Sequence, residues 1–167
     1  LTPQQIAKLP DPKANLDWCG WKGAITDIFS RNARAHPDKP CVIQSIPAES
    51  LDQPQQKVVF SYSAILHAAN VLAHHLIRSG VQREEVVMIY AHRSVDLVVA
   101  VMAVLKAGAT FSVIDPAYPP SRQDIYLRVA QPRGLVVLKG AGTLNPSVRE
   151  FLNTELKIRV EVPALEV

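Results

Sequence analysis

Cysteine, glycine and aromatic side chains are scarce in this chain of 167 residues. Its two cysteines, Cys19 and Cys41, lack metal-ligand spacing and cannot build a disulfide framework. This favours a reducing compartment, so we expect a soluble, cytoplasmic protein. The segment after Leu1 does not resemble a signal peptide. Because Leu1 is not a methionine, we expect the natural start to lie upstream.

Long apolar runs and clusters of one charge are also missing. The most apolar run, residues 95–108, contains Asp96 and Lys106 and is shorter than the roughly 20 residues needed to span a bilayer. The net charge is +3, but the basic residues are scattered and form no aromatic-interleaved patch. We therefore expect neither a membrane nor a nucleic acid as partner.

The chain divides into an N-terminal arm and one partial domain. Residues 1–23 are the predicted arm, because three prolines there favour extended backbone: Pro3, Pro10 and Pro12. Trp18 and Trp21 are expected to anchor this arm on the body. Residues 24–167 are predicted to be a partial α/β domain, in which residues 47–56 form an exposed loop.

Hydrophobic periodicity predicts alternating helices and strands. The predicted helices are 24–36, 62–79, 95–106, 121–131 and 148–156. The predicted strands are 41–46, 58–60, 86–90, 109–114, 135–138 and 158–162. Alternation of this kind indicates an α/β fold with a mostly parallel sheet flanked by helices. Within it, residues 86–114 form a β–α–β unit that should have parallel strands.

Helix ends and apolar faces can also be read from the sequence. The expected N-caps are Ser61, Ser94, Ser147 and a capping box from Ser121 to Asp124. Gly80 and Gly108 are expected to end helices in the left-handed conformation. The expected apolar residues are Ile25, Ile28, Phe29 and Ala33 on the helix 24–36, and Ile65, Ala69, Leu72 and Leu76 on the helix 62–79. On the helix 95–106 they are Leu97, Val98, Val101, Met102, Val104 and Leu105. On the helix 148–156 they are Phe151 and Leu152. Ala100 and Ala103 give the helix 95–106 a small side that another element can approach closely.

Three segments follow predicted strands, where ligands of parallel sheets bind. Lys139-Gly140-Ala141-Gly142 resembles a dinucleotide loop, but Asn145 stands where the third glycine belongs, which favours a plain turn. Residues 90–94 could present free N–H groups to an anion and His92 as an acid or base. Asp115 could bind a ribose or a metal, but we favour a role in capping the turn that follows it through its side-chain oxygen.

Two histidines lie on the polar face of the predicted helix 62–79, where a metal site is conceivable. His67 and His74 lie two turns apart, and about 10 Å of rise is too far for one ion. We expect both to be solvated surface residues.

Two motifs resemble those of adenylate-forming enzymes. The later motif is Leu105-Lys106-Ala107-Gly108, then Ile114-Asp115-Pro116, Tyr118-Pro119 and Arg122. The earlier motif is Phe60-Ser61-Tyr62 with Ala69 and Leu72-Ala73. Each motif alone is a weak signal, but their order and their spacing along the chain make the pair a strong one. The resemblance runs from Trp18 to Leu138.

Further stretches resemble the aminoadipate reductases of lysine biosynthesis. These are Leu16-Asp17-Trp18, Gly20-Trp21-Lys22-Gly23-Ala24-Ile25 and Ala109-Thr110-Phe111-Ser112-Val113-Ile114-Asp115. Ser112-Val113 departs from peptide-synthetase adenylation domains, which often carry proline at the second of these positions.

This resemblance implies a function for a parent enzyme. The parent would activate the side-chain carboxylate of 2-aminoadipate with ATP and Mg and pass the acyl group to phosphopantetheine on a carrier domain of the same polypeptide. NADPH would then reduce the thioester to the semialdehyde.

The family's phosphate loop, ribose-binding aspartate and C-terminal lysine have no counterpart in this sequence. We therefore assign no catalytic, cofactor-binding or metal-binding residue. Gly108, Pro116 and Pro119 are instead expected to shape the backbone.

Two alternatives remain open. The first is the adenylation domain of a peptide synthetase or acyl ligase with another substrate. The second is a self-contained nucleotide-binding or interaction module. In the leading hypothesis the chain is inactive alone, and we expect it to self-associate, because a truncated sheet leaves an unpaired edge.

Overall fold

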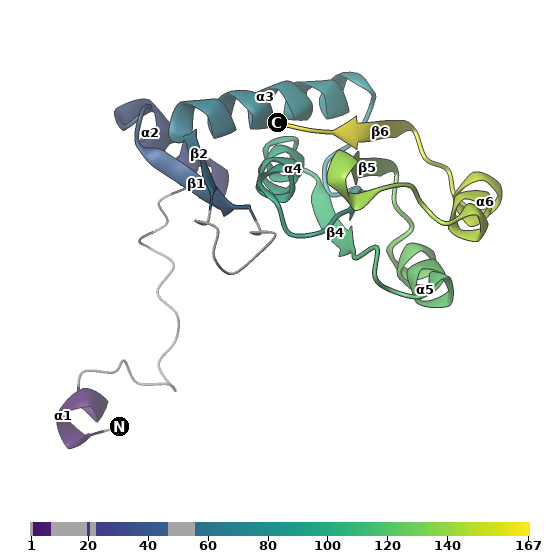
Figure 1. The fold of residues 1–167 in the computed structure, drawn as a ribbon, viewed down its shortest axis with the longest axis horizontal. Coiled ribbons are helices and arrows are strands. Elements are labelled where there is room, and N and C mark those ends of the chain that lie inside the picture. Colours follow the sequence, from purple (N-terminus) through teal and green to yellow (C-terminus); the bar gives the residue numbers. More distant parts are fainter. Residues whose placement is uncertain (1, 8–19, 21–22, 47–55) are drawn as a thin grey trace.

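Four parallel strands form the centre of the domain, and helices cover both faces of this sheet (Figure 1). The computed structural model describes residues 2–7, 20, 23–46 and 56–167. Trp18, Trp21 and residues 47–55, which the sequence assigned to an anchored arm and an exposed loop, lie outside the described residues. The predicted α/β fold class is confirmed.

The sheet has the strand order β4-β3-β5-β6. Its strands are β3 (Val86–Tyr90), β4 (Thr110–Ile114), β5 (Gly134–Leu138) and β6 (Val160–Leu165). Every residue of β5 is buried, as suits a strand covered on both faces. The predicted strand 158–162 is displaced, because β6 begins at Val160 and continues through Pro163.

The helices form two layers. On one face lie α3 (Tyr62–Arg78) and α4 (Val95–Lys106), and on the other lie α5 (Pro120–Ala130) and α6 (Pro146–Glu155). Alternate strand residues enter the two cores, so that Val87 and Ile89 face α3 and α4, while Met88 faces α5 and α6. Each fully buried side chain of this size contributes about 1.5–3 kcal/mol to folding.

A smaller layer lies beside the first core. Helix α2 (Ile25–Ala35) and the antiparallel strands β1 (Pro40–Ser45) and β2 (Lys57–Ser61) form it, and Phe29, Val42 and Phe60 pack against the core (Figure 1). A short helix, α1 (Pro3–Ile6), lies near the N-terminus.

The predicted β–α–β unit is confirmed, because β3 pairs in parallel with β4 across α4. The Ser94 hydroxyl caps α4 by accepting a 3.4 Å bond from the Leu97 N–H. Gly108 follows the helix with φ +75°, a left-handed conformation that favours glycine. The motif glycine therefore has the backbone role that the sequence predicted.

Two predicted apolar faces were partly wrong. On α2, Ile25 and Ile28 are 67% and 40% exposed, whereas Thr26, Ser30 and Ala33 are buried. This buried face of α2 contacts α3 and α4, and the Lys106 ammonium of α4 donates a 2.7 Å bond to the Ser30 hydroxyl.

On α4, the predicted apolar arc does not coincide with the buried face. Val98 is exposed, whereas Val99, Ala100 and Ala103 are fully buried. Ala100 and Ala103 lie in the core that α4 shares with α3, and the two helices lie close together.

Two predicted helix caps were wrong, because proline or asparagine begins the helix instead. Pro119 is the N-cap of α5 and Pro120 its first residue, so Ser121 and Asp124 lie inside the helix and make no capping box. The α6 helix is capped by Asn145, whose Oδ1 accepts a 3.0 Å bond from the Ser147 N–H. A proline at the first helical position has no N–H to satisfy and presets the helical φ.

Only part of the expected inward face of α6 is in the core. Leu152 is buried, but Phe151 is partly exposed. The guanidinium carbon of Arg128 in α5 lies 4.9 Å from the centre of the Phe151 ring.

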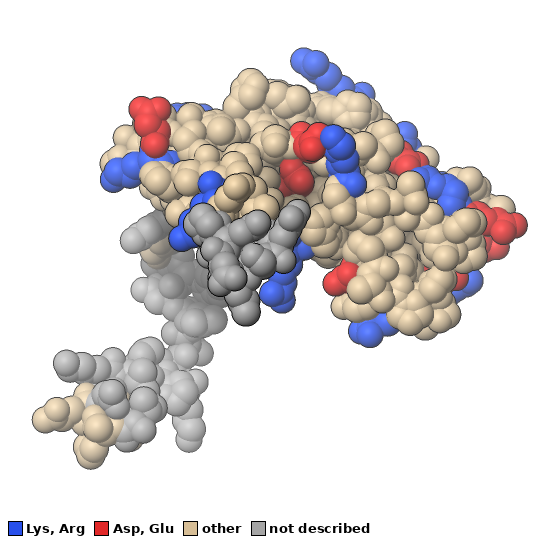
Figure 2. All heavy atoms as spheres, in the orientation of Figure 1, with Lys and Arg blue, Asp and Glu red and all other residues tan. Residues whose placement is uncertain are grey.

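None of the described helices is long and apolar enough to span a membrane. Figure 2 shows positive and negative side chains interspersed over the visible face of the described residues.

Candidate functional site

The segments that the sequence singled out leave the same edge of the sheet. Because β3, β4 and β5 are parallel, their carboxyl ends meet there. The loops after β3 and β5 are in contact, since a Cβ on Gly140 would lie 2.6 Å from Cε1 of His92. A side chain at position 140 would therefore displace the His92 ring.

The N-terminus of α4 does not provide the anion site that was considered. Its Val95 N–H donates a 2.8 Å bond to Oε1 of Gln44, which comes from β1. The Leu97 N–H is bonded to the Ser94 hydroxyl. The Asp96 carboxylate also lies in this first turn and accepts a 2.9 Å bond from the Val167 N–H. Two donors of the first turn are thus already used, and a negative charge is already present.

The loop after β5 is a turn. Residues Lys139–Ala141 form one 3₁₀ turn, which Gly142 ends with φ +75°. The Lys139 ammonium makes a 2.5 Å ion pair with the Glu166 carboxylate beyond β6. The turn expected here is present as one 3₁₀ turn, and its lysine faces a carboxylate of the protein itself.

Asp115 caps the turn after β4. Its Oδ1 accepts a 2.8 Å bond from the Ala117 N–H, and its carbonyl accepts a 3.0 Å bond from the Tyr118 N–H. This is the arrangement by which aspartate stabilises a turn through its side chain. The favoured structural role of Asp115 is confirmed.

Gln123 of α5 forms a hydrogen bond with this turn, which the sequence did not predict. The side chain is 2% exposed, and its Nε2 donates a 2.8 Å bond to the Tyr118 carbonyl. Its Oε1 is buried without a partner among the described atoms. A polar residue four positions before the buried Leu127 is the one signal that could have identified it.

Tyr90 ends β3 beside this turn. Burial raises the pKa of its phenol, an effect that Gln123 partly offsets and the Asp115 charge reinforces. The side chain is 4% exposed, so the phenol is a neutral member of the core at ordinary pH.

The motif arginine stacks on two tyrosines. The Arg122 guanidinium lies 4.1 Å from the centre of the Tyr118 ring, and its Nη2 donates a 3.2 Å bond to the Tyr126 hydroxyl. The two rings stack with their centres 5.8 Å apart. Arg122 therefore joins the Asp115 turn to α5, which is a scaffold role.

The histidines of α3 do not form a metal site. His67 and His74 are both exposed. Among the described residues, no group of three His, Cys, Asp or Glu side chains could hold a metal ion.

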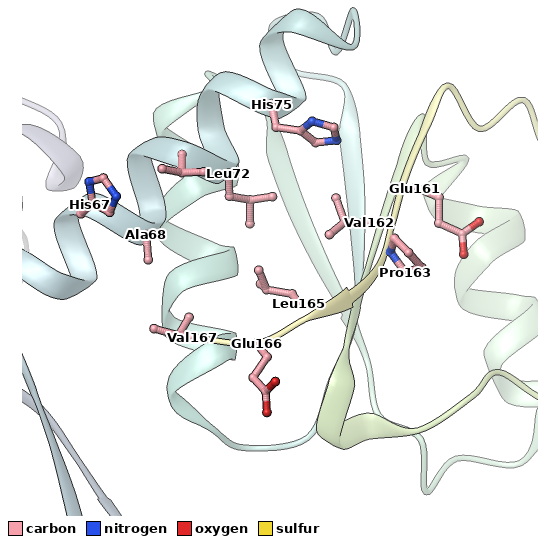
Figure 3. A pocket seen from close by; sticks show the side chains of 11 residues that line it. His67, Ala68, Leu72, His75, Glu161, Val162, Pro163, Leu165, Glu166 and Val167 are labelled. Atoms are coloured by element: carbon pink, nitrogen blue, oxygen red, sulfur yellow. The ribbon is translucent and has the colours of Figure 1, made fainter.

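A groove between α3 and β6 was not predicted. Its volume is about 610 Å³, and its walls include Ala68, Val71 and Leu72 of α3 and Val162 and Leu165 of β6 (Figure 3). Polar side chains at its margins are His67, His75, Glu161 and Glu166. The groove is thus mainly an apolar surface beside the last strand.

Comparison with known proteins places this scaffold in a family. The family described as "AMP-binding enzyme" matches residues 29–165. The "L-2-aminoadipate reductase" of Schizosaccharomyces pombe is 54% identical over all 167 residues, which correspond to 12% of that protein. The "L-2-aminoadipate reductase large subunit" of Penicillium chrysogenum is 56% identical over 99% of this chain and 12% of its own length.

Solved structures agree on the fold. The fatty acid AMP ligase from Legionella pneumophila superposes with a TM-score of 0.63 at 16% identity, covering 89% of this chain and 25% of the ligase. The present chain therefore spans only a small part of the relatives and structures that it matches.

Proposed function

The chain belongs to the AMP-binding enzyme family, and we propose that it is the N-terminal part of the adenylation domain of an L-2-aminoadipate reductase. The observation that carries this proposal is the 54% identity to the reductase of Schizosaccharomyces pombe along the whole chain.

The proposed longer protein is a cytoplasmic enzyme of lysine biosynthesis. Its reaction begins at the side-chain carboxylate of 2-aminoadipate, which is a poor electrophile until one oxygen becomes part of a good leaving group. Transfer of AMP from ATP with Mg achieves this and releases pyrophosphate. A phosphopantetheine thiol on a carrier domain would then displace AMP. Transfer of a hydride from NADPH and of a proton would break the C–S bond, release the thiol and give the semialdehyde.

Two features of the described residues support placing the site for these groups elsewhere in the longer protein. Joining a carboxylate to a polyphosphate requires cationic side chains and free N–H donors that converge on the developing charge. At the carboxyl edge of the sheet, Lys139 is paired with Glu166, and the first N–H groups of α4 are bonded to Gln44 and Ser94. We therefore place the binding of ATP, Mg, phosphopantetheine and NADPH elsewhere in the longer protein.

What this chain contributes to the proposed enzyme is a rigid scaffold. The motif residues Gly108, Asp115 and Arg122 end a helix, cap a turn and join that turn to α5. These roles fix the loops at the sheet edge, against which the rest of an adenylation domain would be built.

The test is aminoadipate-dependent exchange of pyrophosphate into ATP. The longer protein should catalyse exchange with 2-aminoadipate, and this chain alone should catalyse none. Exchange by the isolated chain would contradict the assignment of the reacting groups to other segments. Exchange driven by a different carboxylic acid would identify a peptide synthetase or acyl ligase instead.

A further inference from the structure

A second cavity lies between helices α2 and α3, which pack against each other (Figure 1). Its volume is about 300 Å³, at the lower end of the range for small-molecule sites. Ala33, Pro37 and Leu66 give the cavity an apolar part. It therefore has room for a small organic group, and its polar side chains decide which chemistry that group can carry.

The polar side chains of this cavity can all donate hydrogen bonds, and none of them is a carboxylate. They are Arg34 of α2 and Ser63, His67 and Asn70 of α3. A guanidinium, a hydroxyl, an imidazole and an amide together offer one fixed positive charge and several neutral donors. This combination favours an anionic ligand and disfavours a cationic one.

Arg34 has its charge available for such a ligand. Among the described residues, no carboxylate forms an ion pair with Arg34. The Asp27 carboxylate on the same helix accepts a 3.0 Å bond from the Ala24 N–H at the opposite end of α2. Burial, followed by the charge of Arg34, lowers the pKa of the Lys106 ammonium, an effect that Asp27 partly opposes. Arg34 and Lys106 thus belong to one positive region.

Ser63 can offer a hydroxyl proton to a ligand. Its Oγ lies 3.0 Å from Oγ of Ser61, the N-cap of α3. The Ser61 hydroxyl already accepts a bond from the Ala64 N–H, so it can donate its own proton to Ser63 and leave the Ser63 proton for a ligand. The positive end of the α3 dipole lies at this first turn and also favours an anion.

We propose that the cavity between α2 and α3 binds the phosphate group of a small phosphate monoester. Arg34 pairs with two of the phosphate oxygens, because a guanidinium donates two parallel N–H bonds to such a group. Ser63 and Asn70 donate to the remaining acceptor positions, since a phosphate monoester presents three strong acceptor oxygens in different directions. The apolar part of the cavity holds the organic group of the ester.

The test measures binding of phenyl phosphate to the full-length protein by hydrogen exchange. Peptides covering residues 29–40 and 62–72 should exchange more slowly as phenyl phosphate is added, and the concentration dependence gives the dissociation constant. Because this readout is local, binding of the probe elsewhere in the protein is not counted. Benzoate, which joins the same ring to a carboxylate, should bind more weakly.

Two pairs of matched variants identify the site. Arg34→Gln should weaken binding about tenfold or more, because it removes a charged hydrogen-bond donor. Arg78→Gln removes the same charge from an exposed residue of α3 outside the cavity and should have little effect. Asn70→Asp should also weaken binding about tenfold or more, because a carboxylate replaces a donor. Asn153→Asp adds the same charge at an exposed residue of α6 and should not.

The conservative variant Arg34→Lys separates a specific site from general charge attraction. It keeps the charge but loses the planar fork, so the affinity for phenyl phosphate should fall. An unchanged affinity in Arg34→Lys would overturn the inference, as would absence of protection in either peptide. Equal effects within either matched pair would overturn it too. Binding of benzoate as tight as that of phenyl phosphate would assign the cavity to carboxylates and refute the phosphate ligand.

Discussion

Oε1 of Gln44 accepts the Val95 N–H at 2.8 Å and thereby joins strand β1 to the first turn of α4. The two residues are 51 positions apart in the sequence. This single side chain satisfies a helix donor that would otherwise need a cap or water. It also connects the small antiparallel layer to the β–α–β unit, so the contact couples two parts of the fold.

Replacing Gln44 by alanine should therefore lower the free energy of unfolding by about 1–2 kcal/mol, because the partly buried Val95 N–H loses its acceptor. Urea denaturation measures the change. Gln56→Ala is the matched control, since Gln56 is exposed and bonds to Ile46 through its backbone carbonyl. Equal stability of the two variants would show that the Gln44 contact contributes nothing.

The serine caps give a second prediction, in which sequence and structure differ. Ser61→Ala should cost about 1 kcal/mol, because the Ser61 hydroxyl accepts a 3.2 Å bond from the Ala64 N–H at the start of α3. Ser121→Ala should leave stability nearly unchanged, because α5 begins at Pro120 and Ser121 is not its cap. Thermal or urea unfolding of both variants measures the change. A comparable loss of unfolding free energy in Ser121→Ala would support the capping box that the sequence predicted.

Local signals explain which features could be predicted. The helix Val95–Lys106 was predicted with its observed bounds because a serine precedes it and a glycine follows it within two residues. The Asp115 turn was predicted for the same reason, since its hydrogen bonds join residues at most three apart.

Long-range contacts explain what the sequence could not show. The buried face of α2 includes Ser30, which bonds to the Lys106 ammonium of α4, 76 residues away, and the helix's own apolar periodicity does not reveal this contact. The same holds for the N-terminus of α4. Its local sequence predicts a free Val95 N–H, but Gln44, 51 positions away, accepts a hydrogen bond from it. The groove beside β6 also depends on which strand lies at the sheet edge, and strand order is not encoded in local pattern.

The stability of the protein in acid should depend on Glu85. The Glu85 carboxylate accepts a 2.8 Å bond from the Gln82 N–H and a 2.5 Å bond from Arg159 at the approach to β6. The backbone bond from Gln82, followed by the interaction with Arg159, holds the pKa of Glu85 below its usual value of 4.5. The Glu84 side chain is 82% exposed and makes an ion pair with Arg83, at 3.8 Å.

The sign of the pH effect follows from proton binding. A carboxylate with a lowered folded pKa binds fewer protons in the folded than in the unfolded protein, so its contribution is fully present above pH 4.5 and is lost as the pH falls through the folded pKa. The difference in unfolding free energy between wild type and Glu85→Gln should therefore shrink as the pH is lowered through and below 4.5. Urea unfolding across this range measures it, with Glu84→Gln as control. A pH-independent difference for Glu85→Gln, or an equal pH dependence for Glu84→Gln, would show that the ionised Glu85 carboxylate does not stabilise the connection between the α3–β3 turn and Arg159.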